Sequence, residues 1–231
     1  MNYIPLLQEI NFSLEKARKL QVNLSKKIIL EDCFNKPIKY VAGVDVAYVD
    51  NQSIGAVAVL EYGSMKVVEL KIAEVATRFP YVPTLLSFRE VPPAASAIRK
   101  LKVKPDVFLV DGHGFAHPYR LGLASHLGLV LNIAAIGVAK NLLCGRIIEV
   151  KNKVWKPIVH RGEIIGGAVY TNPNAKPIYV SAGHKVSLES AIKIVLKCSK
   201  GYRIPEPIRK AHALAKKIKT EKLKRKCLLK Q

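Results

Sequence analysis

The chain has 231 residues, and its 38 Lys and Arg outweigh its 17 Asp and Glu to give a net charge of +21. With 49% hydrophobic and 24% charged residues, the composition excludes an intrinsically disordered chain. So strong a positive charge argues against an enzyme for cationic substrates. It indicates a polyanionic partner, with nucleic acid ahead of a membrane surface.

The predicted elements begin with a helix and a three-stranded meander, and strands then alternate with helices. The apolar spacing predicts helices at 7–24, 85–101, 119–127, 187–198 and 208–218. Runs rich in β-branched residues predict strands at 40–48, 54–60, 65–76, 107–110, 129–138, 146–150, 164–170 and 178–181. This order favours one α/β domain with a mixed sheet flanked by helices, covering residues 1–221 and followed by a basic, flexible tail at 222–231.

Three local features refine these predictions. Pro92 and Pro93 are expected to interrupt or restart the second helix, because proline lacks the amide that the helix requires. Ser187 is expected to cap the N-terminus of the fourth helix. A proline-rich loop at 79–83 precedes the second helix.

The charge is unevenly distributed along the chain. Residues 1–150 carry 18 basic and 13 acidic side chains, whereas residues 151–231 carry 20 basic and 4 acidic ones. This pattern suits a protein that holds a polyanion with one region and acts on it with another. The plainer alternative is a solvated basic surface, as on many soluble proteins.

Cysteine usage and hydropathy indicate a cytoplasmic protein. The cysteines lack the close spacing of zinc ligands and are expected to be reduced thiols; they are Cys33, Cys144, Cys198 and Cys227. The uncharged stretch at 121–139 approaches the length of a membrane span, but polar residues and glycines interrupt it. We therefore expect no membrane partner. We also expect a monomer, since no coiled coil is evident.

Acidic residues in apolar surroundings are the candidates for chemistry. Asp45 lies inside an apolar strand, Asp111 ends another, and Glu90 lies in the helix that follows the proline-rich loop. Clustered carboxylates repel one another unless a cation joins them, and oxygen ligands favour Mg²⁺ or Mn²⁺. In a basic protein such a cluster would support metal-assisted attack on phosphodiesters. Taken alone, an acid at a strand end is more typical of a turn or cap residue.

An ordered set of motifs spreads over residues 40–212 and includes these acids. The motifs are Val41-Ala42-Gly43-Val44-Asp45, Pro80-Tyr81-Val82-Pro83, Leu86-Ser87-Phe88-Arg89-Glu90, Asp111-Gly112-His113-Gly114 with His117-Pro118, Ser125-His126-Leu127-Gly128, Gly137-Val138-Ala139-Lys140 and Pro205-Glu206-Pro207. In this order they resemble the endonuclease V family. The resemblance implies a ribonuclease-H-like fold and a deoxyinosine-directed nuclease. Such an enzyme hydrolyses the second phosphodiester 3′ to the lesion and leaves 3′-hydroxyl and 5′-phosphate ends.

The resemblance also implies roles for single residues. Asp45, Glu90 and Asp111 match the acids that bind the catalytic Mg²⁺, for which Mn²⁺ can substitute. Lys140 and His117 match the lysine and histidine near the scissile phosphate. The residues expected to contact DNA are Pro80, Tyr81, Val82, Pro83, Gly112, Gly114 and His126, with Tyr81 at the tip of a strand-separating wedge.

The sequence departs from the family pattern at His113, where glutamine is common, and at His212, where several members have an acid. It also leaves the substrate open between deoxyinosine in DNA and inosine in RNA, because a 2′-hydroxyl can be recognised by many groups. A basic nucleic-acid-binding protein without catalysis is the remaining alternative. Against it, a pure binder gains nothing from carboxylates that face phosphates.

Overall fold

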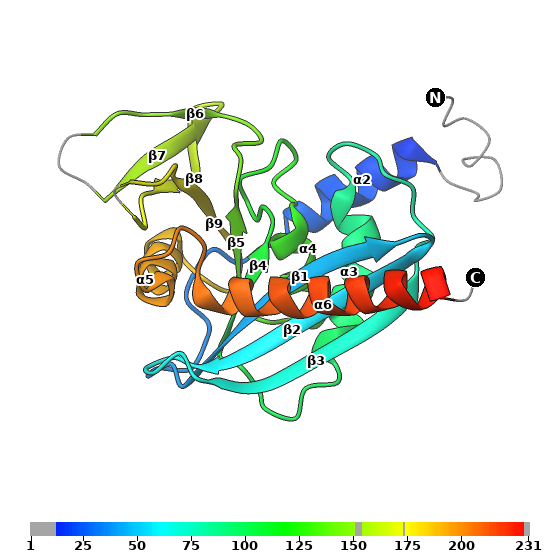
Figure 1. Ribbon diagram of the computed structural model, residues 1–231. Coiled ribbons are helices and arrows are strands. Elements are labelled where there is room, and N and C mark those ends of the chain that lie inside the picture. The colour runs from blue at the N-terminus through cyan, green and yellow to red at the C-terminus, as the bar shows by residue number, and fades with distance from the viewer. Residues whose placement is uncertain (1–12, 151–153, 173, 229–231) are drawn as a thin grey trace.

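A mixed β-sheet forms the centre of the molecule, with helices on both faces (Figure 1). The computed structural model describes residues 13–150, 154–172 and 174–228. Across them the nine strands are ordered β3-β2-β1-β4-β5-β9-β8-β7-β6. The strands are β1 (Tyr40–Val49), β2 (Gln52–Glu61), β3 (Val67–Ala76), β4 (Val107–Asp111), β5 (Ala135–Ala139), β6 (Arg146–Ile147), β7 (Trp155–His160), β8 (Glu163–Val169) and β9 (Ile178–His184). The helices are α2 (Leu14–Ser25), α3 (Leu86–Ile98), α4 (Leu123–Leu131), α5 (Leu188–Ser199) and α6 (Glu206–Leu228).

Pairing directions in the sheet confirm the expected α/β domain. The first three strands form an antiparallel meander, as predicted. β1, β4 and β5 run parallel, and the remaining pairs from β5 to β6 are antiparallel. The two strands that carry Asp45 and Asp111 therefore lie side by side at the centre of the sheet.

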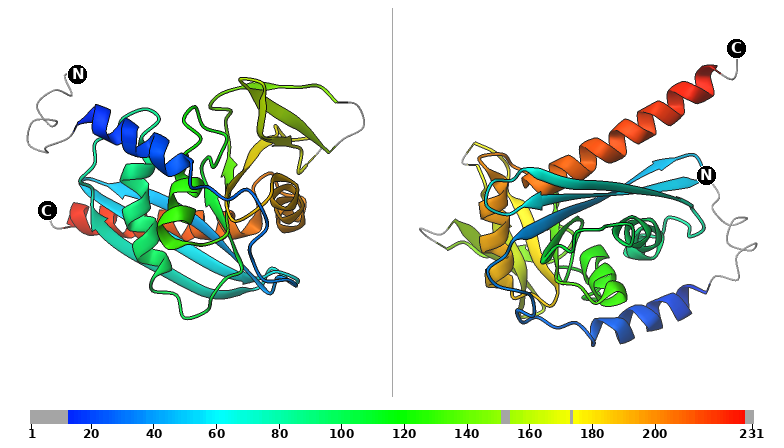
Figure 2. Two further views of the ribbon diagram at one scale, coloured as in Figure 1. Left: turned by 180° about the vertical axis from the view of Figure 1, so that it is seen from behind. Right: turned by 90° about the horizontal axis from the view of Figure 1, so that it is seen from below.

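Alternating side chains of the central strands create two hydrophobic layers. On one face, Val41 and Leu109 pack with α5 and α6. On the other, Ala42 and Phe108 pack with α3 and α4. The view from below shows α6 on one side of the sheet, α3 and α4 on the other, and α2 outside α4 (Figure 2). This layering explains why the central strands are apolar throughout.

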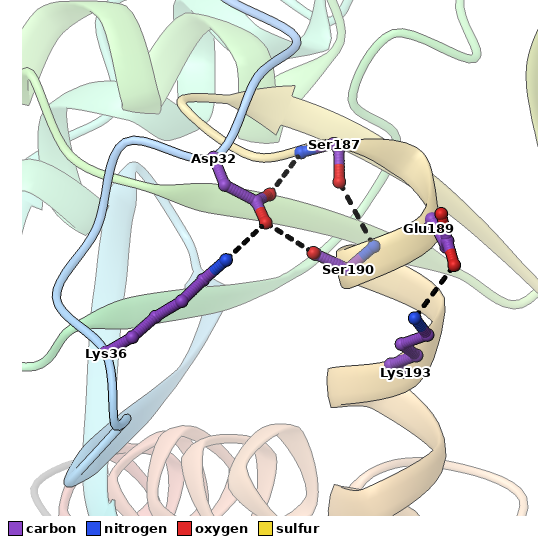
Figure 3. A network of polar contacts seen from close by, with 6 residues as sticks. All are labelled: Asp32, Lys36, Ser187, Glu189, Ser190 and Lys193. Carbon is purple, nitrogen blue, oxygen red and sulfur yellow. Dashed lines mark hydrogen bonds and ion pairs between the residues drawn. The ribbon is translucent and has the colours of Figure 1, made fainter.

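A polar network ties α5 to the segment before β1 (Figure 3). Ser187 caps α5 as predicted, since its side chain accepts a hydrogen bond from the Ser190 amide. Asp32 accepts from the Ser187 amide at 2.9 Å, from the Ser190 hydroxyl at 2.6 Å and from Lys36 at 3.0 Å. These hydrogen bonds lower the pKa of Asp32 to about 2. The helix N-terminus is thereby fixed against a segment distant in sequence.

Two predicted boundaries around the uncharged stretch are wrong. The predicted helix at 119–127 begins later, at Leu123, and continues to Leu131. The predicted strand at 129–138 is therefore only β5, which starts at Ala135. Asn132 ends the helix in a left-handed conformation with φ of 54°. A continuous apolar run has no period that would separate its helical part from its extended part.

Pro92 and Pro93 do not break α3, which runs without interruption from Leu86 to Ile98. Burial of Pro93 and of the alanines that follow it stabilises the helix against the cost of the missing amides. Strand β7 was not predicted at all, because Lys156 and Pro157 interrupt its apolar pattern.

The C-terminal helix is longer than predicted. Residues 222–228, expected to belong to a flexible tail, form the last turns of α6. Residues 229–231, the rest of the predicted tail, and the first part of the predicted N-terminal helix lie outside the described residues. No helix in the described ranges is both long and apolar enough to cross a membrane.

Candidate active site

Register between two parallel strands brings the predicted aspartates together. Val44 of β1 pairs with Val110 of β4, so Asp45 and Asp111, each one residue further on, become neighbours. Their side chains are only 12% and 15% exposed. Asp45 also accepts a hydrogen bond from the Val46 amide at 2.9 Å, which fixes its orientation. The sheet therefore holds two carboxylates side by side at its centre.

His212 completes this cluster from α6. Its Nδ1 lies 2.8 Å from the Asp45 carboxylate, although the two residues are 167 positions apart in the sequence. Ligand atoms of Asp45, Asp111 and His212 all lie within 4.8 Å of one another. The sequence singled out His212 only as a departure from the family pattern. Its position where relatives have an acid was the available signal.

Glu90 enters from α3 but lies outside that three-residue ligand group. Its carboxylate accepts a hydrogen bond from the Tyr48 hydroxyl at 3.0 Å. Burial, together with repulsion from Asp45 and Asp111, raises the pKa of Glu90 to about 7. The three predicted acids are thus electrostatically coupled, while their ligand atoms do not form a single compact set.

Lys140 lies at the end of β5, beside Asp111. Its Nζ is 2.6 Å from the Asp111 carboxylate, and its side chain is 44% exposed. Arg203 donates a hydrogen bond to the Lys140 carbonyl at 2.8 Å and so fixes the backbone at the end of β5. The ammonium group therefore stands next to the acidic cluster and remains accessible to solvent.

The donor set fits a divalent cation. Burial and repulsion from Asp111 raise the pKa of Asp45 as well, so a bound cation would favour its charged form. The two carboxylates are the ligands that Mg²⁺ and Mn²⁺ prefer, whereas the imidazole is more typical of Zn²⁺, Fe²⁺ or Ni²⁺. The groove above the cluster has a volume of about 560 Å³. It is therefore large enough for part of a substrate backbone.

Close backbone packing explains the glycines around the cluster. A Cβ at Gly114 would lie 2.3 Å from the Ala182 carbonyl oxygen, and one at Gly137 would lie 2.2 Å from the Gly114 nitrogen. Gly114 also donates its amide to the Ser181 hydroxyl at 2.9 Å. At Gly112, a Cβ would lie 3.3 Å from the Leu123 side chain. These glycines let the turn after β4 pack directly on β5 and β9.

Two histidines of this turn, half-buried His113 and buried His117, are neutral. Desolvation lowers the pKa of His113 and of His117 to about 4. His117 accepts a hydrogen bond from the Tyr119 amide at 3.2 Å and bonds the Thr84 backbone. Its contacts therefore connect the turn to the proline-rich loop. The structure does not bring His117 into the ligand group of Asp45, Asp111 and His212.

The proline-rich loop presents one aromatic ring to solvent. Tyr81 is 61% exposed, and Pro80, Val82 and Pro83 flank it. The base of the loop is held by α2, where Arg18 donates to the Pro83 carbonyl at 3.2 Å.

Gln21 of α2 strengthens this anchor. It is fully buried and donates to the Thr84 carbonyl at 2.8 Å and the Leu121 carbonyl at 3.3 Å. The exposed ring of Tyr81 therefore projects from a fixed base.

His126 was expected to contact DNA, but the structure buries it between α3 and α4. Its Nδ1 lies 3.0 Å from the Ser87 hydroxyl, and its ring packs edge-on against Phe88 at a centroid distance of 4.9 Å. Because His126 is only 7% exposed, it contributes to the packing of these two helices, and its contact with DNA stays a prediction.

Comparisons with known proteins agree over most of the chain. The sequence profile of Endonuclease V matches residues 22–213. Endonuclease V of Trichormus variabilis is 49% identical over 207 residues, which cover 88% of this chain and 94% of the relative. The solved Endonuclease V of Streptomyces avermitilis has a TM-score of 0.85 and 36% identity, covering 91% of this chain and 95% of that one.

A further solved structure is that of Endonuclease V from Ciona intestinalis, in complex with a 24mer DNA that contains an inosine followed by a ribo-adenosine. It has a TM-score of 0.81 and 35% identity, covering 90% of this chain and 98% of that one. Sequence and structure thus agree on one assignment, and the chain belongs to the Endonuclease V family.

Proposed function

We propose that this protein is a DNA repair endonuclease that recognises deoxyinosine and hydrolyses the second phosphodiester 3′ to it. The observation that carries the proposal is the cluster of Asp45, Asp111 and His212 beside Lys140, on the floor of an open groove. The Ciona relative crystallised with inosine-containing DNA supports the substrate. The overall charge of +21 supplies the attraction for a polyanion.

Asp45, Asp111 and His212 would hold the cation, with Glu90 as the third carboxylate of the site. When bound, Mg²⁺ or Mn²⁺ polarises a phosphoryl oxygen and lowers the pKa of a water molecule. Lys140 is a compact point charge beside Asp111, suited to stabilise the negative charge that develops on the phosphoryl group. Glu90, buried and bonded to the Tyr48 hydroxyl, would add a third negative charge to balance the cation.

The Tyr81 loop and the glycine-rich turn would recognise the lesion. Reading a deaminated base requires taking it out of the stack, and an exposed ring can replace the stacking that is lost. Gly112 and Gly114 allow backbone groups to approach the displaced base. His117 is neutral and hydrogen-bonded to the Thr84 backbone. It would fix the position of the turn relative to the loop and would not donate a proton.

Four unpaired cysteines support a cytoplasmic location, because thiols persist where the environment is reducing. We propose that the enzyme acts there as a monomer.

A cleavage assay on matched oligonucleotides tests the proposal. Strands carrying deoxyinosine, inosine or adenine at one position are incubated with Mg²⁺, with Mn²⁺ or with EDTA. We expect a single nick, at the second phosphodiester 3′ to deoxyinosine, and only when metal is present. Cleavage restricted to inosine in RNA would identify an endoribonuclease, and binding without any nick would identify a non-catalytic binder.

The matched variant is Asp111→Asn, which keeps the side-chain shape and removes the charge. We expect cleavage to fall by about 100-fold or more, because several kcal/mol of charge stabilisation are lost. DNA binding should remain measurable. Wild-type activity in this variant would refute the assignment of the metal site.

A further inference from the structure

The last turns of α6 are strongly basic and lie beyond the part of the chain that the family profile matches. That match ends at residue 213. Residues 214–228 contain seven Lys and Arg and a single acid, Glu221. In Figure 1 this red helix crosses in front of β1 and β2. The helix therefore lies over β1, the strand that carries Asp45 of the acidic cluster.

One face of this helix is neutralised by the meander. Lys222 forms an ion pair with Glu74 at 2.5 Å and donates to Gln52 at 2.8 Å. Lys226 pairs with Asp50 at the tip of the β1–β2 turn. These contacts attach the helix to the sheet. Lys222 and Lys226 are therefore already paired with groups of the meander.

A second face points toward the active site. Lys216 and Lys219 follow His212 at the four- and three-residue steps of one helical stripe. Both line the groove of about 560 Å³ that also contains Asp45 and Asp111. With a rise of about 1.5 Å per residue, they lie about 6 and about 10 Å from His212 along the helix axis.

Neither lysine is used by the fold. Within the ranges that the structure describes, Lys216 and Lys219 form no ion pair, and both are exposed. Two unpaired cations beside an acidic cluster would bind an anion that extends beyond it. The anion that this site takes is a phosphodiester chain.

We propose that Lys216 and Lys219 bind backbone phosphates of the substrate strand next to the scissile phosphate. This inference rests on the proposed function. The lysines offset the repulsion between the acidic cluster and the approaching backbone, and they align the strand along α6. They are positioning residues, since they reach neighbouring phosphates and not the reacting one.

The test compares Lys216→Gln and Lys219→Gln with Lys217→Gln. The control removes the same charge from the same helix, but Lys217 lines neither the active-site groove nor the cavity beside the meander. Affinity for an inosine-containing duplex is measured in EDTA across a range of KCl concentrations. Cleavage with Mg²⁺ is measured in parallel to separate KM from kcat.

The logarithm of the DNA affinity falls linearly with the logarithm of the salt concentration, and the steepness of this line is the salt slope. Each of the two test variants should reduce the salt slope on duplex DNA by about 0.9. At 0.1 M salt that slope corresponds to an affinity about eightfold weaker, with KM raised and kcat unchanged. Lys217→Gln should change affinity by less than about twofold. Test variants that match this control, or that lower kcat without weakening binding, would overturn the proposal.

The two proposals fail separately. If the wild-type protein nicks inosine substrates and the lysine variants bind like the control, only the α6 contacts are wrong. If the wild-type protein never nicks and the salt slopes still fall as expected, the phosphate contacts stand and the catalytic function does not.

Discussion

Replacing Glu90 with glutamine should change how the stability of the metal-free protein depends on pH. Burial and the neighbouring aspartates raise the pKa of Glu90 from 4.5 to about 7 in the folded state. The folded state therefore binds a proton that the unfolded state releases. This contribution to stability is complete below pH 4.5 and is lost as pH rises through about 7.

The magnitude follows from the size of the shift. One pKa unit corresponds to about 1.4 kcal/mol, so Glu90 contributes about 3 kcal/mol that disappears between pH 4.5 and pH 8. Buried histidines produce the opposite trend: the pKa of each of His113, His117 and His126 is about 4, so their contribution is lost as pH falls below 6.5. Both proteins share these histidines, so subtracting the free energy of unfolding of Glu90→Gln from that of the wild type cancels the histidine contribution.

The assay is urea unfolding in EDTA at a series of pH values, for wild type, Glu90→Gln and the surface control Glu31→Gln. The free energy of unfolding of the wild type, relative to Glu90→Gln, should fall by about 3 kcal/mol from pH 4.5 to pH 8. Glu31→Gln should follow the wild type, because Glu31 is exposed. Saturating Mg²⁺ or Mn²⁺ should reduce the difference, since a bound cation stabilises the charged carboxylates. A constant difference between wild type and Glu90→Gln in EDTA would refute the reasoning.

Other predictions concern the loop and the turn. Gln21→Leu should lower the free energy of unfolding by about 2–4 kcal/mol, because a buried carbonyl and a part-buried one lose their donor; an unchanged urea midpoint would contradict this. Gly137→Ala should cost about 1–3 kcal/mol and impair cleavage, because its Cβ would lie 2.2 Å from a backbone nitrogen of the turn; a fully active, equally stable variant would argue against that packing. Tyr81→Ala should lose about 1–3 kcal/mol of stacking and so about tenfold of the preference for deoxyinosine over adenine, while Tyr81→Phe keeps it; equal preference in both variants would exclude the wedge.

The strand pattern and the placement of the aspartates could be read from the sequence. β1, β2 and β4 lie where runs of β-branched residues predicted them, because those residues fit a pleated, buried surface. Asp45 and Asp111 follow such runs, so pairing of the two strands was enough to bring them together. The N-cap Ser187 was likewise a local matter, decided by a hydroxyl and a nearby amide.

Only the tertiary structure decided which side chains join those aspartates. His212 meets Asp45 across 167 residues, a contact that depends on how α6 crosses the sheet and not on any local pattern. The burial of His126 depends in the same way on the packing of α3 against α4. Lys222 to Leu228 looked like a solvated tail, yet good helix formers and ion pairs with the meander hold these residues in α6. The sequence by itself determined the strands and their acids. The fold decided which distant residues complete the site, because contacts between remote segments depend on three-dimensional packing.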